Sequence, residues 1–277
     1  MPDDQTTPAK KKSILAALAP FGLMAPIVAI LVFLLFGYGP STADNGNDNA
    51  AIQAAIDSAT RSGESRERDD GRKPAEVLKF FGIKPGMTVL EVGAGTGYYA
   101  EIVSAAVGPE GKVIAQNSPT EFYLNTIQAI FEPMAEQLAN VEPHVAPLED
   151  LKVADNSVDV AMILLIYHHM HYTEAEGEKL PISAQGHLKV LLKALKPGGV
   201  LGIIEHAAPD GTNRADSAAL HRVDEATTVA DITGAGFTLA AKSDLLQVAS
   251  DDRTVYWSRT VHMGKTWRIL HKYVKPE

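Results

Sequence analysis

The stretch Val-Leu-Glu-Val-Gly-Ala-Gly-Thr-Gly-Tyr-Tyr-Ala, residues 89–100, decides the fold of this chain. It begins as a short apolar, β-branched run, which predicts a buried parallel strand, and it ends where a helix is expected to begin. Gly93, Gly95 and Gly97 lie between the two, so the chain can turn tightly and a ligand can approach the backbone. The expected helix would offer unpaired N–H groups and its positive dipole end to that ligand.

Glu91 narrows the choice of ligand. The dinucleotide fingerprint is Gly-x-Gly-x-x-Gly, but Tyr98 stands where its third glycine belongs. A carboxylate beside the glycine loop would repel a pyrophosphate and suits a ligand with a cationic or hydroxyl-bearing part. The pattern Glu-x-Gly-x-Gly-x-Gly resembles the first motif of the class I S-adenosylmethionine (SAM)-dependent methyltransferases. The resemblance implies that Gly93, Gly95 and Gly97 pack on the methionine part of SAM, whose amino end Glu91 helps to hold; a tight turn without a ligand is the alternative.

Composition limits the class of protein. The chain has 277 residues, 45% of them hydrophobic and 21% charged, which indicates a globular protein of one large or two small domains. It has no cysteine, which excludes disulfides and cysteine zinc sites. The formal charge is −9 and no basic stretch is dense enough for a nucleic-acid track, so no nucleic-acid partner is predicted.

The N-terminus carries a targeting or membrane signal. Lys10, Lys11 and Lys12 precede an uncharged stretch, residues 13–38, long enough at ~1.5 Å per residue to cross a bilayer core of about 30 Å. It predicts a single-pass anchor or an export signal cleaved after Ala43, and its length favours the anchor. The lysines should stay in the cytoplasm, which would place the rest of the chain in the periplasm. Because SAM is made in the cytoplasm, a domain that faces the cytoplasm is the second possibility.

Three segments follow from this. Residues 1–43 are the membrane anchor or signal segment, residues 44–65 are a polar, turn-rich stretch expected to be a flexible linker that contains a short helix, and residues 66–277 are the methyltransferase-like domain. Arg68 and Arg72 lie in a mixed-charge patch at the start of that domain. The patch predicts either a solvated helix entry or a lid whose arginines reach the cofactor's carboxylate or the substrate.

The expected nucleoside contacts depart from the family pattern. The family usually has an acidic residue for the ribose hydroxyls after its second strand, and Gln116 or Asn117 stands at that position here. An amide still hydrogen-bonds to a diol, without charge assistance. On the adenine side, Glu149 or Asp150 is the candidate, and a carboxylate that merely favours a helix N-terminus is the alternative.

A histidine-rich segment ends the most apolar strand, residues 160–166. Ligands of open α/β sheets bind at the carboxyl ends of strands, so His168 or His169 is predicted to accept the substrate's proton or orient the acceptor atom. A surface histidine is the alternative. No metal site is predicted, because neighbouring side chains of an extended segment point in opposite directions. Glu205 and His206, after the strand at residues 200–204, are further candidates.

Later segments extend the resemblance over residues 66–277. Lys-Pro-Gly-Gly at residues 196–199 is similar to a later motif of the family, and Gly-Lys-Thr-Trp-Arg at residues 264–268 resembles the tail of a bacterial "predicted methyltransferase" group with no assigned substrate. The resemblance implies an α/β, Rossmann-like doubly wound sheet of seven strands, mostly parallel, with an antiparallel last strand. It also implies SAM-dependent methylation of a small molecule. A non-catalytic SAM-fold binding or scaffold protein of the cell envelope is the alternative, and the sequence gives neither acceptor nor oligomeric state.

Overall fold

The computed structural model describes residues 44–171, 184–257 and 264–277. The predicted anchor or signal, residues 1–43, therefore lies outside the described residues. Within the described ranges, no helix combines the length and the apolar character that crossing a bilayer requires. The fold below is that of the described residues within the compact unit 41–277.

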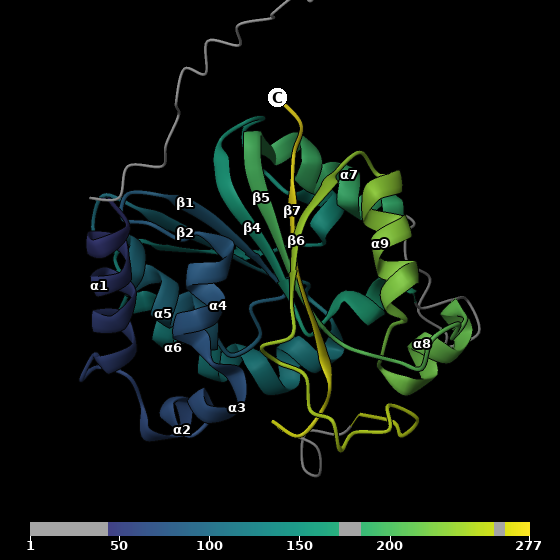
Figure 1. Ribbon diagram of the computed structural model, residues 1–277. Coiled ribbons are helices and arrows are strands. Elements are labelled where there is room, and N and C mark those ends of the chain that lie inside the picture. The colour runs from purple at the N-terminus through teal and green to yellow at the C-terminus, as the bar shows by residue number, and fades with distance from the viewer. Residues whose placement is uncertain (1–43, 172–183, 258–263) are drawn as a thin grey trace, which may run out of the picture. The chain divides into compact units, whose positions relative to one another are not determined.

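A seven-stranded sheet with the order β3-β2-β1-β4-β5-β7-β6 forms the centre of this unit (Figure 1). Strands β1 to β5 are parallel, and β7 is antiparallel to both β5 and β6, as predicted. The strands are β1 (Thr88–Val92), β2 (Lys112–Asn117), β3 (Val141–Val145), β4 (Val158–Leu164), β5 (Leu195–His206), β6 (Thr238–Ser243) and β7 (Arg268–Val274).

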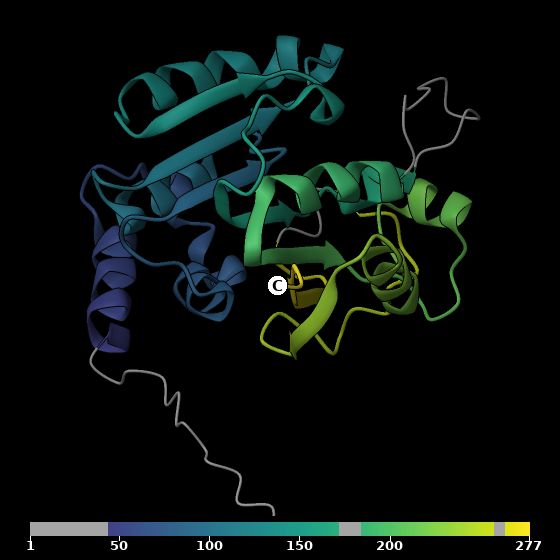
Figure 2. The ribbon, with the colours of Figure 1, turned by 90° about the horizontal axis from the view of Figure 1, so that it is seen from above.

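Helices cover both faces of the sheet (Figure 2). The apolar cluster on one face includes residues of α1 (Asp44–Asp57), α4 (Pro74–Phe81), α5 (Tyr98–Val107) and α6 (Gln128–Glu136). The cluster on the other face includes residues of α7 (Ala184–Ala194) and α9 (Glu225–Gly234). Val89 packs in the first cluster and its neighbour Leu90 in the second, so each strand of the centre is apolar on both sides.

The predicted linker differs from the structure. Residues 44–57 form α1, where Ile52 and Ala55 are buried in the apolar cluster that also holds α4 and α5. The two short helices α2 (Gly63–Arg66) and α3 (Asp69–Arg72) then lead into α4. Two apolar side chains one turn apart thus dock α1, a largely polar helix, against the rest of the fold.

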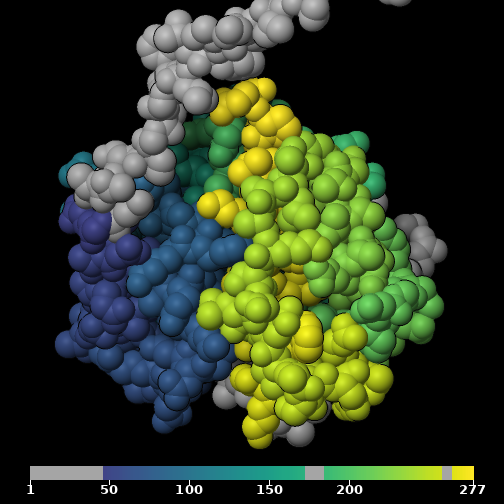
Figure 3. Space-filling model, in the orientation of Figure 1, coloured from purple at the N-terminus to yellow at the C-terminus, as the bar shows by residue number. Residues whose placement is uncertain are grey.

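The carboxyl ends of the strands carry the irregular elements. The chain runs from β1 outward to β2 and β3 and then returns to β4, so the connections after β1 and β4 diverge at this edge. Around it lie η1 (Tyr123–Ile127), η2 (Leu148–Asp150), η3 (Tyr167–His171) and α8 (Arg214–Leu220). On one side of the molecule, the N-terminal helices and the C-terminal residues lie side by side (Figure 3), where Lys73 Nζ donates to the carbonyl of Leu245 at 3.0 Å.

Candidate active site

Two neighbouring cavities open at this edge. The first, of about 900 Å³, is called the histidine cavity and is lined by Glu91, Arg68, Arg72, His168, His206 and Arg268, among others. The second, of about 1050 Å³, is called the amide cavity and is lined by Gln116, Asn117, Tyr123 and Glu149, among others. Gly93, Gly95, Ile166 and His169 line both, so the glycine loop forms part of the boundary between them.

The glycine loop adopts the left-handed backbone that its glycines allow. The φ angles of Gly93, Gly95 and Gly97 are 63°, 58° and 88°. A Cβ on Gly93 would lie 2.5 Å from Ile166 Cδ1, whereas the nearest atom to a Cβ on Gly95 would be Gly93 O at 4.0 Å. A side chain at Gly95 would therefore enter open space that a ligand can use. The loop leads into α5, which begins at Tyr98, where a helix was expected to begin.

Glu91 is a buried carboxyl group with one unmatched oxygen. It is only 3% exposed, and its Oε2 has no hydrogen-bond partner among the described residues. Burial raises its pKa to about 8, although the charges of Arg72 and Arg68 and a backbone hydrogen bond from Ala100 oppose this shift. A buried oxygen without a partner costs free energy, so a cationic ligand group would be stabilised here.

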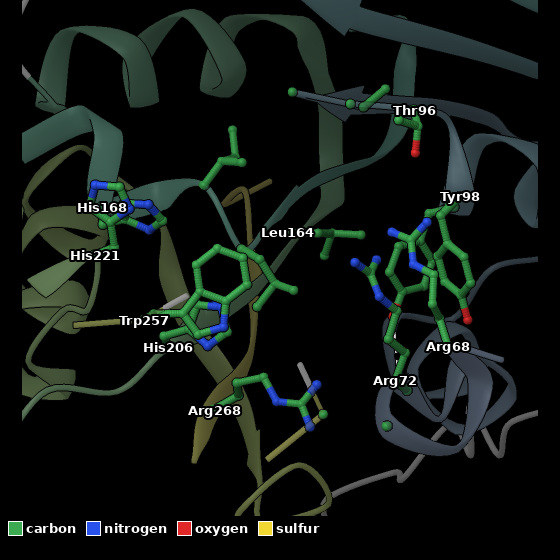
Figure 4. Close-up of a pocket in the computed structure, with 18 of the residues that line it drawn as sticks. Arg68, Arg72, Thr96, Tyr98, Leu164, His168, His206, His221, Trp257 and Arg268 are labelled. Atoms are coloured by element: carbon green, nitrogen blue, oxygen red, sulfur yellow. Dashed lines mark hydrogen bonds between the residues drawn. The ribbon is translucent and has the colours of Figure 1, made fainter. Parts of the chain in front are cut away.

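Arg68 and Arg72 lie beside Glu91 at the wall that α3 and the N-terminus of α5 provide (Figure 4). Their guanidinium carbons are 4.6 and 4.5 Å from the ring centroid of Tyr98. The hydroxyl of Tyr98 donates to Asp69 at 2.6 Å, and Asp69 in turn accepts two hydrogen bonds of 2.7 Å from the buried Arg61. The network holds α3 against α5, and the two arginines can receive an anionic group next to Glu91.

The side-chain amides of Gln116 and Asn117, which were predicted to bind the ribose, form hydrogen bonds to backbone groups, including those of the glycine loop. Asn117 accepts from the backbone N–H of Gly95 at 2.8 Å and donates to its carbonyl at 3.2 Å. Gln116 accepts from the N–H of Gly93 at 3.0 Å and donates to the carbonyl of Ala146 at 2.7 Å. Both side chains line the amide cavity and fix the glycine loop, and these bonds use one of the two N–H donors and one of the two lone pairs of Asn117.

Of the two carboxylates proposed for the adenine side, one lines a cavity. Glu149 lines the amide cavity, where its Oε2 lies 3.4 Å from Nε2 of His187. Asp150 is exposed and does not line either cavity. Both lie in the short helix η2 that follows Pro147, where consecutive side chains point in different directions, so Glu149 lines the cavity and its neighbour Asp150 lies in solvent.

His168 is held by a buried carboxylate. Its Nδ1 lies 3.1 Å from Oε1 of Glu205, and its backbone N–H donates to Oε2 at 3.0 Å. Burial alone would raise the pKa of Glu205, but the charge and hydrogen bond of His168 lower it, so Glu205 is a carboxylate with no exposed surface. This pair fixes the ring of His168 and supports a positive charge on it.

His169 lies beside His168 rather than opposite to it. The segment is the 3₁₀ helix η3 and not extended chain, so the prediction that the two side chains diverge is wrong. The ring centroids of His168 and His169 are 4.4 Å apart, and His221 stacks on His168 at 4.8 Å. Among the described residues, no group of three His, Asp or Glu side chains has the arrangement of a metal site.

The opposite wall comes from segments that the sequence analysis named only in part. His206 stacks on Trp257 with ring centroids 4.6 Å apart, and its Nδ1 lies 2.8 Å from Oγ1 of Thr266. Figure 4 shows Arg268 below this pair, extending toward the side that carries Arg72. Trp257 was missed because it is distant in sequence from every motif. Arg268 ends the segment at residues 264–268, which was interpreted only as a family-like tail. Arginine at the first position of a strand beside the ligand edge was the available signal.

Comparisons with known proteins agree with this geometry. The family model of protein-L-isoaspartate(D-aspartate) O-methyltransferase matches residues 59–146, which contain the glycine loop. A ubiquinone/menaquinone biosynthesis C-methyltransferase, UbiE, from Ectopseudomonas mendocina is 27% identical over 134 residues, which are 48% of this chain and 47% of that protein. The chain thus spans about half the length of this curated relative.

Solved structures resemble the whole fold. A SAM-dependent methyltransferase from Aquifex aeolicus aligns with a TM-score of 0.54 at 23% identity, over 82% of this chain and 98% of that chain. The [4+2]-cyclase SpnF aligns with a TM-score of 0.55 at 17% identity, over 84% of this chain and 95% of that chain. One neighbour is thus named for a different reaction, so the fold by itself does not decide the chemistry.

SAM is the cofactor that the matched family and the named methyltransferases imply, and the buried, half-satisfied Glu91 beside the glycine loop fits its amino group. The chain therefore has the fold that defines the class I SAM-dependent methyltransferase superfamily.

Proposed function

We propose that this protein transfers the methyl group of SAM to a small-molecule acceptor bound in the histidine cavity. The observation that carries the proposal is the unmatched Oε2 of Glu91 beside the glycine loop, with Arg68 and Arg72 on the same cavity wall. An amino acid has a cationic and an anionic end close together. Glu91 suits its ammonium group, and the two arginines suit its carboxylate.

The rest of the cofactor has room on the other side of the loop. The open space at Gly95 allows close approach to the backbone, and the amide cavity is large enough for a nucleoside. Asn117 and Gln116 would support the ribose indirectly, by holding the loop in place. Glu149 is the polar side chain that lines this cavity on the η2 side.

Bound SAM would supply a methyl carbon made electrophilic by its sulfonium, which leaves as a neutral thioether. His168 is the residue placed to take the acceptor's proton, since Glu205 fixes its ring and stabilises the imidazolium. The bond from acceptor to methyl forms as the sulfur–methyl bond breaks, and its electron pair stays on sulfur. Holding both reactants in one closed site contributes roughly 7–11 kcal/mol of barrier reduction in well-oriented reactions.

The proposal is tested by methyl transfer. Full-length protein is incubated with tritiated SAM and a fraction of small molecules from the source cells, and label in the extracted products is counted. We expect labelled product with wild type and a loss of at least tenfold in His168→Gln. His144→Gln is the matched control, since His144 lies on β3 and lines neither cavity. Full activity in His168→Gln would remove the proton-transfer role.

A binding protein without catalysis is the second candidate. The observation in its favour is that the amides at the ribose position, Gln116 and Asn117, accept hydrogen bonds from the backbone N–H groups of Gly93 and Gly95. Such a protein would bind SAM or its demethylated product equally well and label no acceptor from any extract. Detection of one labelled product whose formation depends on His168 contradicts it.

We further propose that residues 13–38 anchor the chain in a membrane or direct its export. The support is the sequence, with its three lysines before an uncharged stretch. Carbonate washing of cell membranes followed by mass spectrometry tests both versions. An anchored chain stays with the membrane and keeps its first residues, whereas an exported chain is found free and begins at Asp44.

A further inference from the structure

Among the residues that the structure describes, the wall of the histidine cavity opposite Glu91 presents hydrogen-bond donors without acceptors. Arg268 is 4% exposed and lines the cavity, and its Nε donates to the carbonyl of Thr266 at 3.3 Å. Within residues 44–171, 184–257 and 264–277, no carboxylate pairs with it. Nε1 of Trp257 is buried and has no partner in the same described ranges.

These two side chains can only donate. Guanidinium and indole N–H groups have no acceptor atom, so their unmet capacity requires oxygen lone pairs from a ligand. His206 adds a third polar atom, because its Nε2 is buried and unpartnered in the described part of the chain. Burial lowers the pKa of His206 well below its ordinary value, which favours the neutral ring, with a proton on one nitrogen and an acceptor lone pair on the other.

Arg268 belongs to the acceptor side of the cavity. The pKa of Glu91 is lowered by the charges of Arg72 and Arg68. Arg268 lies near His206 and Trp257 instead (Figure 4), so we assign it to their wall. Arg72 and burial both lower the pKa of Arg268, so the site already holds like charges in proximity. A sulfonium would add a further positive charge. The carboxyl groups that line the cavity besides Glu91 are Glu67 and Asp70, which are exposed at its rim.

The walls are flat as well as electropositive. His206 and Trp257 are stacked at an interplanar angle of 23°, and His168 and His221 at 24°. Tyr256 lies against His221, with ring centroids 4.8 Å apart. Flat aromatic surfaces pack best on another planar ring.

We propose that the acceptor is a planar aromatic molecule with an anionic oxygen substituent, held by Arg268 and Trp257. This inference rests on the proposed function, which supplies SAM at Glu91 and leaves the opposite wall to the acceptor. Arg268 binds the oxyanion, Trp257 donates to it, and the stacked rings hold the plane of the acceptor. The anion also offsets the charge that the sulfonium brings into the cavity.

Binding of simple probes tests the inference without knowledge of the acceptor. Benzoate, its neutral isostere benzamide, and acetate are titrated into full-length protein saturated with S-adenosylhomocysteine, and binding is followed by ligand-observed NMR. We expect benzoate to bind at least tenfold more tightly than benzamide, because the amide is neutral and cannot pair with Arg268, and more tightly than acetate, which has no ring. Equal affinity for benzoate and benzamide, or no saturable benzoate binding, overturns the inference.

Two variants of Arg268 separate charge from folding. Arg268→Gln should reduce the preference for benzoate over benzamide to about one, and Arg268→Lys, which keeps the charge, should retain at least a threefold preference. Arg253→Gln is the control, since Arg253 stacks on Trp267, pairs with Asp210 and does not line the cavity. It should behave as wild type.

The cofactor serves as the second readout. S-adenosylhomocysteine affinity should change less than threefold in Arg268→Gln. An equal loss of S-adenosylhomocysteine and benzoate affinity would assign Arg268 to the cofactor's carboxylate and overturn the inference. Should S-adenosylhomocysteine not bind wild type at all, the proposed function fails, and the benzoate preference is then measured on the protein alone.

Discussion

At the scale of single residues, Glu91 and Glu205 show how hydrogen-bond partners set the pKa of a buried carboxyl group. Both carboxyl groups of this site are hidden from water, yet Glu205 has three hydrogen-bond donors and Glu91 has an unmatched oxygen. The pKa of Glu205 is lowered while that of Glu91 rises to about 8. Glu205 is a carboxylate that holds His168, and Glu91 becomes a carboxylate when a cationic group binds beside it.

The raised pKa of Glu91 predicts proton release on cofactor binding. Near pH 7 the free protein holds Glu91 protonated, and an ammonium group favours the carboxylate. SAM affinity should therefore rise with pH toward about 8, and close to one proton should be released at pH 7. Calorimetric titration in two buffers of different ionisation enthalpy measures that proton. A flat affinity and no proton exchange would contradict the assigned role.

The same group affects stability without ligand. Because the pKa of Glu91 is higher in the folded than in the unfolded chain, its contribution is fully present below about pH 4.5 and is lost as pH rises through about 8. Glu91→Gln should remove this decline. Urea unfolding of wild type and variant between pH 6 and 9 checks it, and parallel curves would argue against the shift.

At the scale of elements, the glycine loop is placed by its neighbours on the sheet. Its backbone is fixed by Gln116 and Asn117 from β2, and Gly95 alone among its glycines faces open space over its Cβ direction. The loop is therefore preformed. A ligand thus meets a fixed backbone with open space at Gly95, where a side chain would otherwise lie; we call this space the cradle.

Gly95→Ala should weaken SAM binding at least tenfold, since the added methyl group fills that cradle. Gly86→Ala is the matched control, because Gly86 also has a positive φ of 79° and open space, but it precedes β1 at the opposite edge of the sheet. Both variants should lose about 1 kcal/mol of stability from left-handed backbone. Thermal melting and SAM titration separate the effects. Equal SAM affinity in the two variants would count against the cradle.

Arg61 joins the N-terminal helices to α5. It is 4% exposed, pairs with Asp69 and donates to the carbonyl of Ile56 at 2.9 Å. Arg61→Met leaves the partly buried Asp69 without its guanidinium partner and should cost about 3 kcal/mol, the lower end for a buried pair. Lys84→Met, which breaks the more exposed pair with Asp48, should cost about 0–1 kcal/mol. Urea unfolding measures the stability of both variants. Similar losses would show that the Arg61 network does not hold the N-terminal helices against α5.

The elements also show what sequence patterns can and cannot predict. The strand, loop and helix around Gly93 were predictable because strand burial, glycine spacing and helix period are local. The partners of Asn117 were not, since a hydrogen bond to Gly95 depends on the register between β1 and β2. Arg268 reaches the cavity through the antiparallel pairing of β7 with β5. Trp257 reaches it through a loop whose backbone N–H donates to the carbonyl of Leu220, and no local pattern encodes either contact.

At the scale of the whole molecule, the sheet topology determines where the two cavities lie. The strand order places β1 beside β4, the loop after β1 separates the cavities, and segments from both ends of the described chain form the histidine cavity. Cofactor and acceptor would thus meet where N-terminal helices face C-terminal strands. The central claim is that SAM binds this cleft through Glu91.

Calorimetric titration of SAM into full-length wild type, Glu91→Gln and Glu110→Gln tests that claim most directly. Glu110 is exposed in the turn before β2, at the sheet edge away from the cavities, and controls for the loss of a charge. We predict saturable binding by wild type and Glu110→Gln and a loss of at least tenfold in Glu91→Gln. Equal affinity in all three proteins, or no binding by folded wild type, would contradict it.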